Sequence, residues 1–125
     1  MLVDTDVLIW YMRGHKHAAD RLNALESMAV SIVTYIELVQ GLRTKRELRA
    51  LRLTFANLGI SVLPLTETVS YKAAFLVEQH FHSHALRLAD ALIGATALGS
   101  GLGLLTANTK HYRVIDGLDV NRFRP

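Results

Sequence analysis

The chain has 125 residues, half of them hydrophobic, and it contains no cysteine. This length is typical of one domain, so we expect residues 1–125 to fold as a single domain around one core. The lack of cysteine excludes a disulfide scaffold and a thiolate metal site, and it fits a cytoplasmic protein. The formal net charge of +3 is compatible with a polyanionic partner but does not require one.

Two apolar segments need to be distinguished from targeting or membrane segments. The N-terminus lacks a basic leader, and Asp4 and Asp6 interrupt its apolar run, so we do not expect a signal peptide. Residues 91–109 carry no charged side chain and approach the length of a membrane span. Closely spaced glycines in their second half predict a buried helix, a turn and a strand instead, and therefore no membrane segment.

The first half of the chain alternates between short apolar runs and helical patterns. In order, it predicts a strand over residues 1–3, helices over 7–12 and 17–27, a strand over 28–33, helices over 34–42 and 45–58, and a strand over 60–63. Thr34 and Glu37 match a capping box at the start of the 34–42 helix. Gly59 follows residues 45–58 as a C-cap glycine would.

The second half continues the same alternation. It predicts helices over residues 66–80 and 87–98, a strand over 102–106 and an edge strand over 114–123. Short apolar strands separated by helices predict an α/β fold, with a short, mostly parallel central sheet between two helical layers. Ligands bind such sheets beyond the carboxyl ends of the strands.

Three acidic residues are candidates for a site at that edge. Asp4 directly follows the first buried run, Glu37 follows the second strand, and Asp90 lies in the small-residue helix LADALIGATAL. Each has a structural alternative: Asp4 as a helix N-cap, Glu37 as the capping-box residue, and Asp90 as an acid near a helix N-terminus. Together they would form a set of oxygen ligands suited to Mg²⁺ or Mn²⁺. Such an ion can activate water for attack on a phosphodiester.

Four blocks of the sequence resemble the motifs of a known family. MLVDTDVLI, SIVTYIELVQG, LADALIGATAL and LLTANTKHYRVIDGLDV are similar in order and spacing to the motifs of PIN-domain ribonucleases, and most similar to the VapC-type toxins of toxin–antitoxin pairs. The resemblance covers almost the whole chain. It implies a PIN-like three-layer α/β/α fold and a single PIN-like domain over residues 1–125.

The resemblance also implies roles for individual residues. Asp4, Glu37 and Asp90 match the catalytic acids that bind the metal ion. Thr106 matches a hydroxyl residue near the site, and Asn108 stands where many members carry a fourth acid. Asp6, which stands where asparagine is common, matches a supporting residue next to the ligands.

For the whole protein, the resemblance implies a Mg²⁺- or Mn²⁺-dependent endoribonuclease that forms a homodimer and is inhibited by a cognate antitoxin. Contact with DNA is expected only through the antitoxin. Basic residues near the predicted site are candidate RNA contacts. These residues are Lys110, His111, Arg113, Arg43 and Arg46.

Two other functions remain open from the sequence. Asp4-Thr5-Asp6 also matches the D-x-D motif of haloacid-dehalogenase-like phosphatases, in which Asp4 would be the nucleophile and Asp6 the general acid. No paired acidic motif follows later in the chain, which counts against that function. The second alternative is a catalytically inactive module that binds RNA or an antitoxin, and the presence of all three acids counts against it.

Overall fold

A computed structural model describes residues 1–83 and 85–125. Short strands form one sheet in the order β3-β2-β1-β4-β5, and every neighbouring pair in it is parallel. The strands are β1 (Leu2–Val3), β2 (Met28–Ser31), β3 (Ile60–Leu63), β4 (Leu104–Thr106) and β5 (Val120–Arg122). Because β1 lies at the centre of the sheet, the residues that directly follow it are flanked by the carboxyl ends of β2 and β4.

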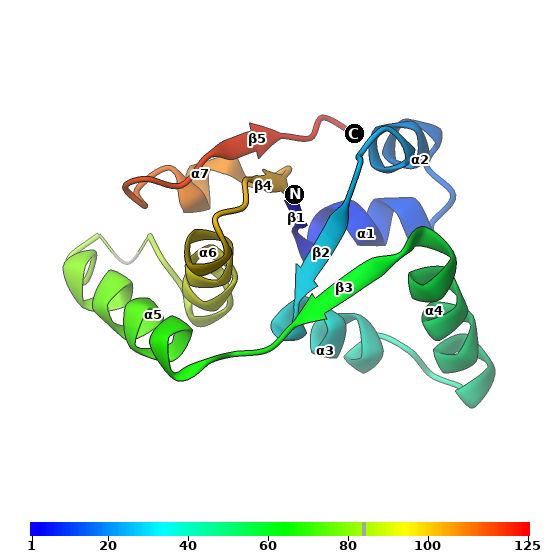
Figure 1. Cartoon of the computed structure of the whole chain (residues 1–125), viewed down its shortest axis with the longest axis horizontal. Coiled ribbons are helices and arrows are strands. Elements are labelled where there is room, and N and C mark those ends of the chain that lie inside the picture. Colours follow the sequence, from blue (N-terminus) through cyan, green and yellow to red (C-terminus); the bar gives the residue numbers. More distant parts are fainter. Residues whose placement is uncertain (84) are drawn as a thin grey trace.

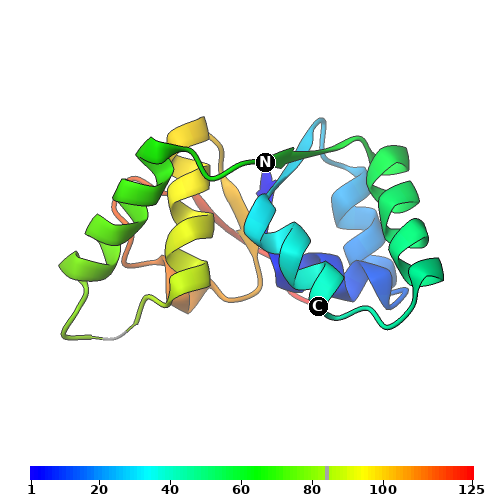
Figure 2. The same cartoon turned by 90° about the horizontal axis from the view of Figure 1, so that it is seen from below.

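Helices cover both faces of this sheet. One side carries α1 (Thr5–Met12), α2 (Lys16–Asn23), α3 (Ile32–Gln40) and α4 (Lys45–Leu58), and the other carries α5 (Glu67–Gln79), α6 (Leu88–Ser100) and the short α7 (Thr109–Tyr112) (Figures 1 and 2). Successive strand residues point to opposite faces. Leu2 and Leu104 belong to the core beside α5 and α6, whereas Val3 and Leu105 belong to the core beside α1 and α4. The predicted three-layer α/β/α fold is therefore confirmed.

The boundaries of α4 agree with the sequence prediction at both ends. Thr44 caps the helix by accepting a hydrogen bond from the backbone N–H of Glu47, and Gly59 ends it with a φ of 64°. A left-handed residue favours glycine because a Cβ atom would be strained there. Leu51 and Phe55 form its buried stripe, as its helical spacing predicts.

Near the predicted site, two helices begin earlier than expected. α1 starts at Thr5 rather than Val7, directly after Asp4. α3 starts at Ile32 because the side chain of Ser31, not that of Thr34, accepts the capping hydrogen bond, from the N–H of Val33. The capping box was therefore a wrong prediction, and β2 ends at Ser31 instead of continuing to residue 33.

The C-terminal quarter differs most from the prediction. The expected strand over residues 114–123 is only three residues long, at Val120–Arg122, and α7 was not predicted. The uncharged stretch 91–109 divides between α6 and β4, with Gly101 ending the helix at a φ of 65°. Among the described helices, none has the length and apolar character that crossing a membrane requires.

Candidate active site

Asp4 is the buried centre of the candidate site, with 5% of its surface exposed. As the N-cap of α1, its Oδ1 accepts a 2.8 Å hydrogen bond from the backbone N–H of Thr5. Its Oδ2 accepts a 2.7 Å hydrogen bond from the hydroxyl of Thr106, which in turn accepts one from the N–H of Asn108. The prediction that Asp4 caps a helix is thus confirmed, through Oδ1. The other oxygen, Oδ2, is hydrogen-bonded to Thr106 of β4 instead.

The environment of Asp4 disfavours its negative charge. Burial, and secondly the nearby charge of Asp6, raise the pKa of Asp4 to about 6, against the lowering effect of hydrogen bonds from Thr106, Thr5 and Tyr112. Burial and the charges of Asp4 and Asp90 raise the pKa of Tyr112, so its hydroxyl stays protonated and donates to Asp4. A desolvated carboxylate with a raised pKa is stabilised by a nearby cation.

Glu37 lies in the second turn of α3 and is exposed. Its Oε1 accepts a 2.6 Å hydrogen bond from the hydroxyl of Thr5, whose oxygen is also hydrogen-bonded at 2.9 Å to the hydroxyl of Thr34. Glu37 therefore binds Thr5 rather than the amide of Thr34 that the capping-box alternative requires. Since Thr5 contacts Asp4 through its backbone and Glu37 through its side chain, it joins the two acids.

Asp90 lies in the first turn of α6, and its side chain is 16% exposed. Its Oδ2 is 3.3 Å from Nδ1 of His111 in α7. Its charge also acts on Tyr112, which donates to Asp4. α6 and the segment after α7 approach closely, since a Cβ atom added at Gly94 would lie 2.6 Å from Cδ1 of Ile115. Asp90 and Asp4 therefore share Tyr112 as a neighbour.

Asp6 is close to Asp4 because the helix begins at Thr5. Its Oδ2 accepts a 3.1 Å hydrogen bond from the N–H of Ala107, whereas its Oδ1 is buried and has no hydrogen-bond partner among the described residues. Burial raises the pKa of Asp6 as well. Asp6 therefore adds negative charge next to Asp4 and ties α1 to the segment that follows β4.

The carboxylates of Asp4, Glu37 and Asp90 are suited to a divalent cation, although they are not arranged as a complete set of metal ligands. Within residues 1–83 and 85–125, no three acidic or imidazole side chains are arranged to hold a metal ion as they stand. The carboxylates of Asp4, Glu37 and Asp90 instead accept from, or lie beside, Thr106, Thr5 and His111. They remain hard oxygen donors, and one of them is buried with a raised pKa.

The other residues singled out by the sequence fall into two groups. Asn108, Lys110 and His111 line a pocket next to the acids. Arg113 follows α7, and Arg43 and Arg46 lie between α3 and the first turn of α4; these three arginines are exposed. Among the described residues, no salt bridge joins any of the three to the acids, so their role in RNA binding stays a prediction.

Sequence reasoning did not identify three residues that connect the acids: Thr5, Thr34 and Tyr112. A signal was present for two of them. Thr5 lies between two acids, and Thr34 is a polar residue in an otherwise apolar stretch, where burial requires a hydrogen-bond partner. Tyr112 lies in a helix that was not predicted, and its contact with Asp4 depends on the position of that helix.

Comparisons with known proteins agree with this fold. The PIN domain family model matches residues 1–117. Ribonuclease VapC10 of Mycobacterium tuberculosis is 36% identical over 124 residues, which cover 94% of this chain and 90% of the relative. Ribonuclease VapC19 of the same species is 30% identical over 122 residues, covering 94% of this chain and 95% of the relative.

Solved structures give the same result. A toxin–antitoxin complex from Klebsiella pneumoniae superposes with a TM-score of 0.76 at 29% identity, covering 94% of this chain and 93% of that chain. VapBC-1 from nontypeable Haemophilus influenzae superposes with a TM-score of 0.83 at 23% identity, covering 97% and 96%, and shows the shared fold. From the family match over residues 1–117 and the similarity to VapC ribonucleases over nearly its full length, this chain belongs to the PIN-domain family.

Proposed function

We propose that this protein is an endoribonuclease, the toxin of a toxin–antitoxin pair, and that it acts in the cytoplasm as a single domain over residues 1–125. Asp4, Glu37 and Asp90 are its catalytic acids. The observation that carries the proposal is the linked arrangement of these acids through Thr5 and Tyr112 around a buried carboxylate with a raised pKa. The identity of 36% to a protein named as a ribonuclease supports the same activity.

The proposed cofactor is one Mg²⁺ or Mn²⁺ ion held by Asp4, Glu37 and Asp90. Bound there, it would supply charge to offset that of the phosphodiester and to activate a water molecule. The protein's part is to orient the ligands. Thr106 and Tyr112 fix the Asp4 carboxylate, and Thr5 fixes Glu37.

Residues around the acids support this role. Asp6 and Asn108 hold the segment after β4, Asp6 through its side chain and Asn108 through its backbone N–H. Because the acids repel a polyanion, the RNA strand must be bound by nearby cations. Lys110 and His111 beside the site, together with Arg113, Arg43 and Arg46, are the proposed RNA contacts.

The test is cleavage of single-stranded RNA by the purified chain, with Mg²⁺, with Mn²⁺ and with a chelator, followed by mapping of the new ends. We expect internal cuts that require the metal and disappear in Asp4→Asn. Asp116→Asn, which removes the same charge from an exposed turn, is the matched control. Release of phosphate from monoesters without internal cuts would favour the phosphatase alternative, and no metal-dependent effect on RNA would favour the inactive module.

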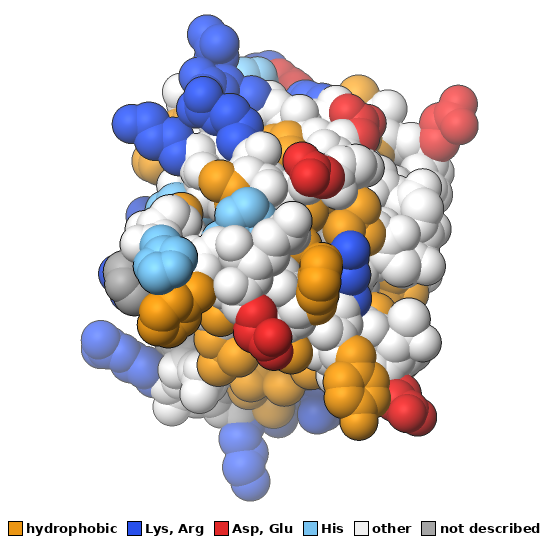
Figure 3. Space-filling model, turned by 90° about the vertical axis from the view of Figure 1, so that its left-hand side faces the viewer, with side chains coloured by type: hydrophobic (Ala, Val, Ile, Leu, Met, Phe, Trp, Pro, Cys, Tyr) orange, Lys and Arg blue, Asp and Glu red, His pale blue; other side chains and the backbone are white. Residues whose placement is uncertain are grey.

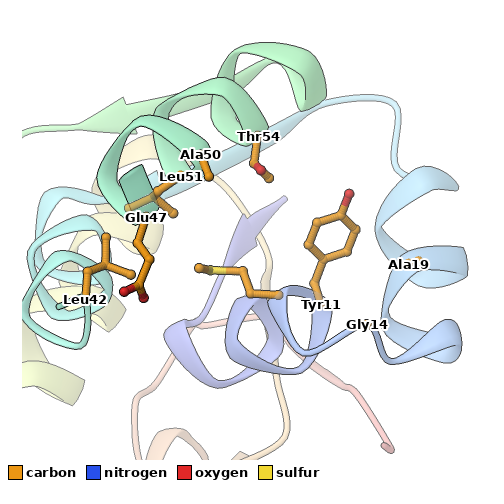
Figure 4. Close-up of a pocket in the computed structure, with 9 residues that line it drawn as sticks. Tyr11, Gly14, Ala19, Leu42, Glu47, Ala50, Leu51 and Thr54 are labelled. Atoms are coloured by element: carbon orange, nitrogen blue, oxygen red, sulfur yellow. The ribbon is translucent and has the colours of Figure 1, made fainter. Parts of the chain in front are cut away.

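A groove beside the acids is the proposed binding place of the antitoxin. A cavity of about 460 Å³ lies between α1 and α4, where Leu42 and Glu47 face Tyr11 (Figure 4). A second cavity, of about 270 Å³, shares Met12 and Leu42 with it and extends to Glu37. An amphipathic segment fits such a groove. The carboxylate of Glu47 favours a basic residue in the first cavity, whereas Glu37 and Arg13 both line the second. The similar structure from Klebsiella pneumoniae is a toxin–antitoxin complex.

Blocking this groove should prevent inhibition without affecting catalysis. Ala50 lines the groove on α4, whereas Ala56 is exposed on the same helix and does not line it. We expect Ala50→Arg to lose binding of the cognate antitoxin while still cleaving RNA, and Ala56→Arg to keep both. Inhibition of Ala50→Arg at the wild-type antitoxin concentration would refute the groove as the docking place. Contact with DNA is proposed only through that antitoxin.

A homodimer is the proposed state of the free protein. Tyr71 and Phe75 on α5 are 71% and 54% exposed, and hydrophobic side chains are visible on the end of the molecule that α5 covers (Figure 3). Large exposed apolar side chains on one helix are typical of an interface. Light scattering should show a dimer that Phe75→Ser weakens and Ala74→Ser, on the same helix, does not; a monomeric wild type would contradict the proposal.

A further inference from the structure

A basic pocket of about 430 Å³ lies between α7 and the C-terminal residues. Its charged side chains are Lys110 from α7, Arg122 at the end of β5 and Arg124 after it, with His111 at its rim. No acidic residue lines it. In the part of the chain that the structure describes, none of these three cations forms a salt bridge with a carboxylate.

The sheet holds Arg122 in place at the level of the active site. β5 pairs with β4 so that Arg122 lies opposite Thr106, the residue that donates to Asp4. The N–H of Phe123 donates a 2.8 Å hydrogen bond to the carbonyl of Thr106. The Arg122 guanidinium donates a 2.8 Å hydrogen bond to the buried hydroxyl of Thr109. One nitrogen is thus anchored, and the other donors of the guanidinium remain for a ligand.

Two residues join this pocket to the acids. His111 lines the pocket, and its Nδ1 is 3.3 Å from Oδ2 of Asp90. Asn108 also lines the pocket. Its backbone N–H donates to the hydroxyl of Thr106, which in turn donates to Asp4. The pocket and the acid cluster are therefore adjacent parts of one surface, one positive and the other negative.

We propose that this pocket binds a backbone phosphate of the RNA strand next to the bond that is cut, with Lys110, Arg122 and Arg124 as its ligands. The proposal rests on the proposed ribonuclease function. Guanidinium groups match phosphate oxygens in a bidentate geometry, and an anchored arginine loses little freedom when it binds. The pocket thus holds the strand beside carboxylates that would otherwise repel it.

The test measures RNA binding separately from cleavage. In an Asp4→Asn background, we compare Arg122→Gln/Arg124→Gln with Arg49→Gln/Arg52→Gln, which removes the same charge from exposed positions of α4. Single-stranded RNA that the wild type cleaves is titrated at several salt concentrations with Mg²⁺ present.

We expect the pocket variant to bind RNA about tenfold or more weakly, and its salt slope to fall by about 0.7 for each phosphate contact that is lost. The α4 variant should change neither quantity by a comparable amount. Arg124→Gln alone gives a version that keeps the Thr109 hydrogen bond of Arg122, in case the double variant does not fold. Its affinity should fall, with an unchanged thermal melting temperature.

Equal affinity and equal salt slope in the pocket and α4 variants would overturn the phosphate pocket while leaving the ribonuclease proposal intact. Loss of antitoxin binding with unchanged RNA binding would also overturn it, because the pocket would then serve the protein partner. Failure of the wild-type chain to cleave any RNA would instead refute the proposed function itself. A final check replaces single phosphates by neutral methylphosphonates near the mapped cut. At one position, this replacement should weaken RNA binding by the Asp4→Asn protein with an intact pocket. The same replacement should have little effect on binding by the pocket variant.

Discussion

The hydroxyl of Thr5 donates a hydrogen bond of 2.6 Å to Oε1 of Glu37, and it thereby connects the first turn of α1 to α3. Thr5→Val keeps the shape of the side chain and removes this donor. We expect RNA cleavage to fall by about 10- to 100-fold, the range typical of residues that orient metal ligands. Thr5→Ser, which keeps the donor, should retain most of the activity. Equal rates for the valine and serine variants would show that Thr5 does not position Glu37.

Removing the charge of any one proposed metal ligand should abolish cleavage. We expect Asp4→Asn, Glu37→Gln and Asp90→Asn each to lose nearly all metal-dependent activity, and the triple variant to be little worse than a single one, because the three act as a unit. Circular dichroism and thermal melting check that each variant folds. Normal cleavage by a folded single variant would remove that residue from the site.

The stability of the metal-free protein should rise as the pH falls from 7 to 5. The pKa of Asp4 is raised from 3.8 to about 6 in the folded chain, so folding favours the protonated form. The charged form therefore costs the fold about 3 kcal/mol above pH 6, and this cost is relieved as the pH falls through the folded pKa toward 3.8. Asp6, whose pKa is also raised, acts in the same direction.

Urea unfolding at pH 5 and pH 7 measures this effect, and Asp4→Asn is the control because it cannot titrate at that position. We expect the difference between the two pH values to be smaller in Asp4→Asn than in the wild type. Mg²⁺ should stabilise the wild type more at pH 7 than at pH 5, since protons compete for the same oxygens. An identical pH dependence in both proteins would show that Asp4 is ionised without cost in the folded state.

We expect Asn108 to limit the charge available to a second ion. Its backbone N–H supports Thr106 whatever the side chain, so substitutions there test the side chain alone. We expect the wild type to bind one ion tightly, Asn108→Asp to bind metal more tightly, and Asn108→Ala to lose less activity than Asp4→Asn. Calorimetry of metal binding without RNA measures the first two. Two equally bound ions in the wild type would contradict the role we give to this position.

The sequence predicted those parts of the fold in which one local signal dominates. The helix over 45–58 was located at both ends because Thr44 and Gly59 supply its caps and no nearby residue competes with them. In α3 two capping patterns overlap, and Ser31, at the end of β2, caps the helix three residues before Thr34. A local pattern does not reveal which hydroxyl is oriented for capping, because that depends on where the buried strand ends.

The sequence predicted which acidic residues belong to the candidate site, but not which residues connect them. Asp4 and Glu37 are indeed linked, but through Thr5, and this link depends on α1 beginning two residues earlier than its apolar pattern suggests. The first half of the expected strand over 114–123 failed because Ile115 is buried from a bend, not from a strand. Its apolar character was read correctly, whereas its backbone geometry depends on packing against Gly94 of α6.

The hydrogen bond from Thr106 to Asp4 joins residues 102 positions apart in the sequence, and this has a consequence for synthesis of the protein. The chain emerges from the ribosome from its N-terminus, so Asp4, Glu37 and Asp90 are all made before β4 and α7, which complete their surroundings. Contacts of such large sequence separation form late in folding, because closing the loop between them costs entropy. We therefore expect a nascent or truncated chain that ends before Thr106 to lack RNA cleavage, because the Asp4 carboxylate is not yet held by its partner from β4.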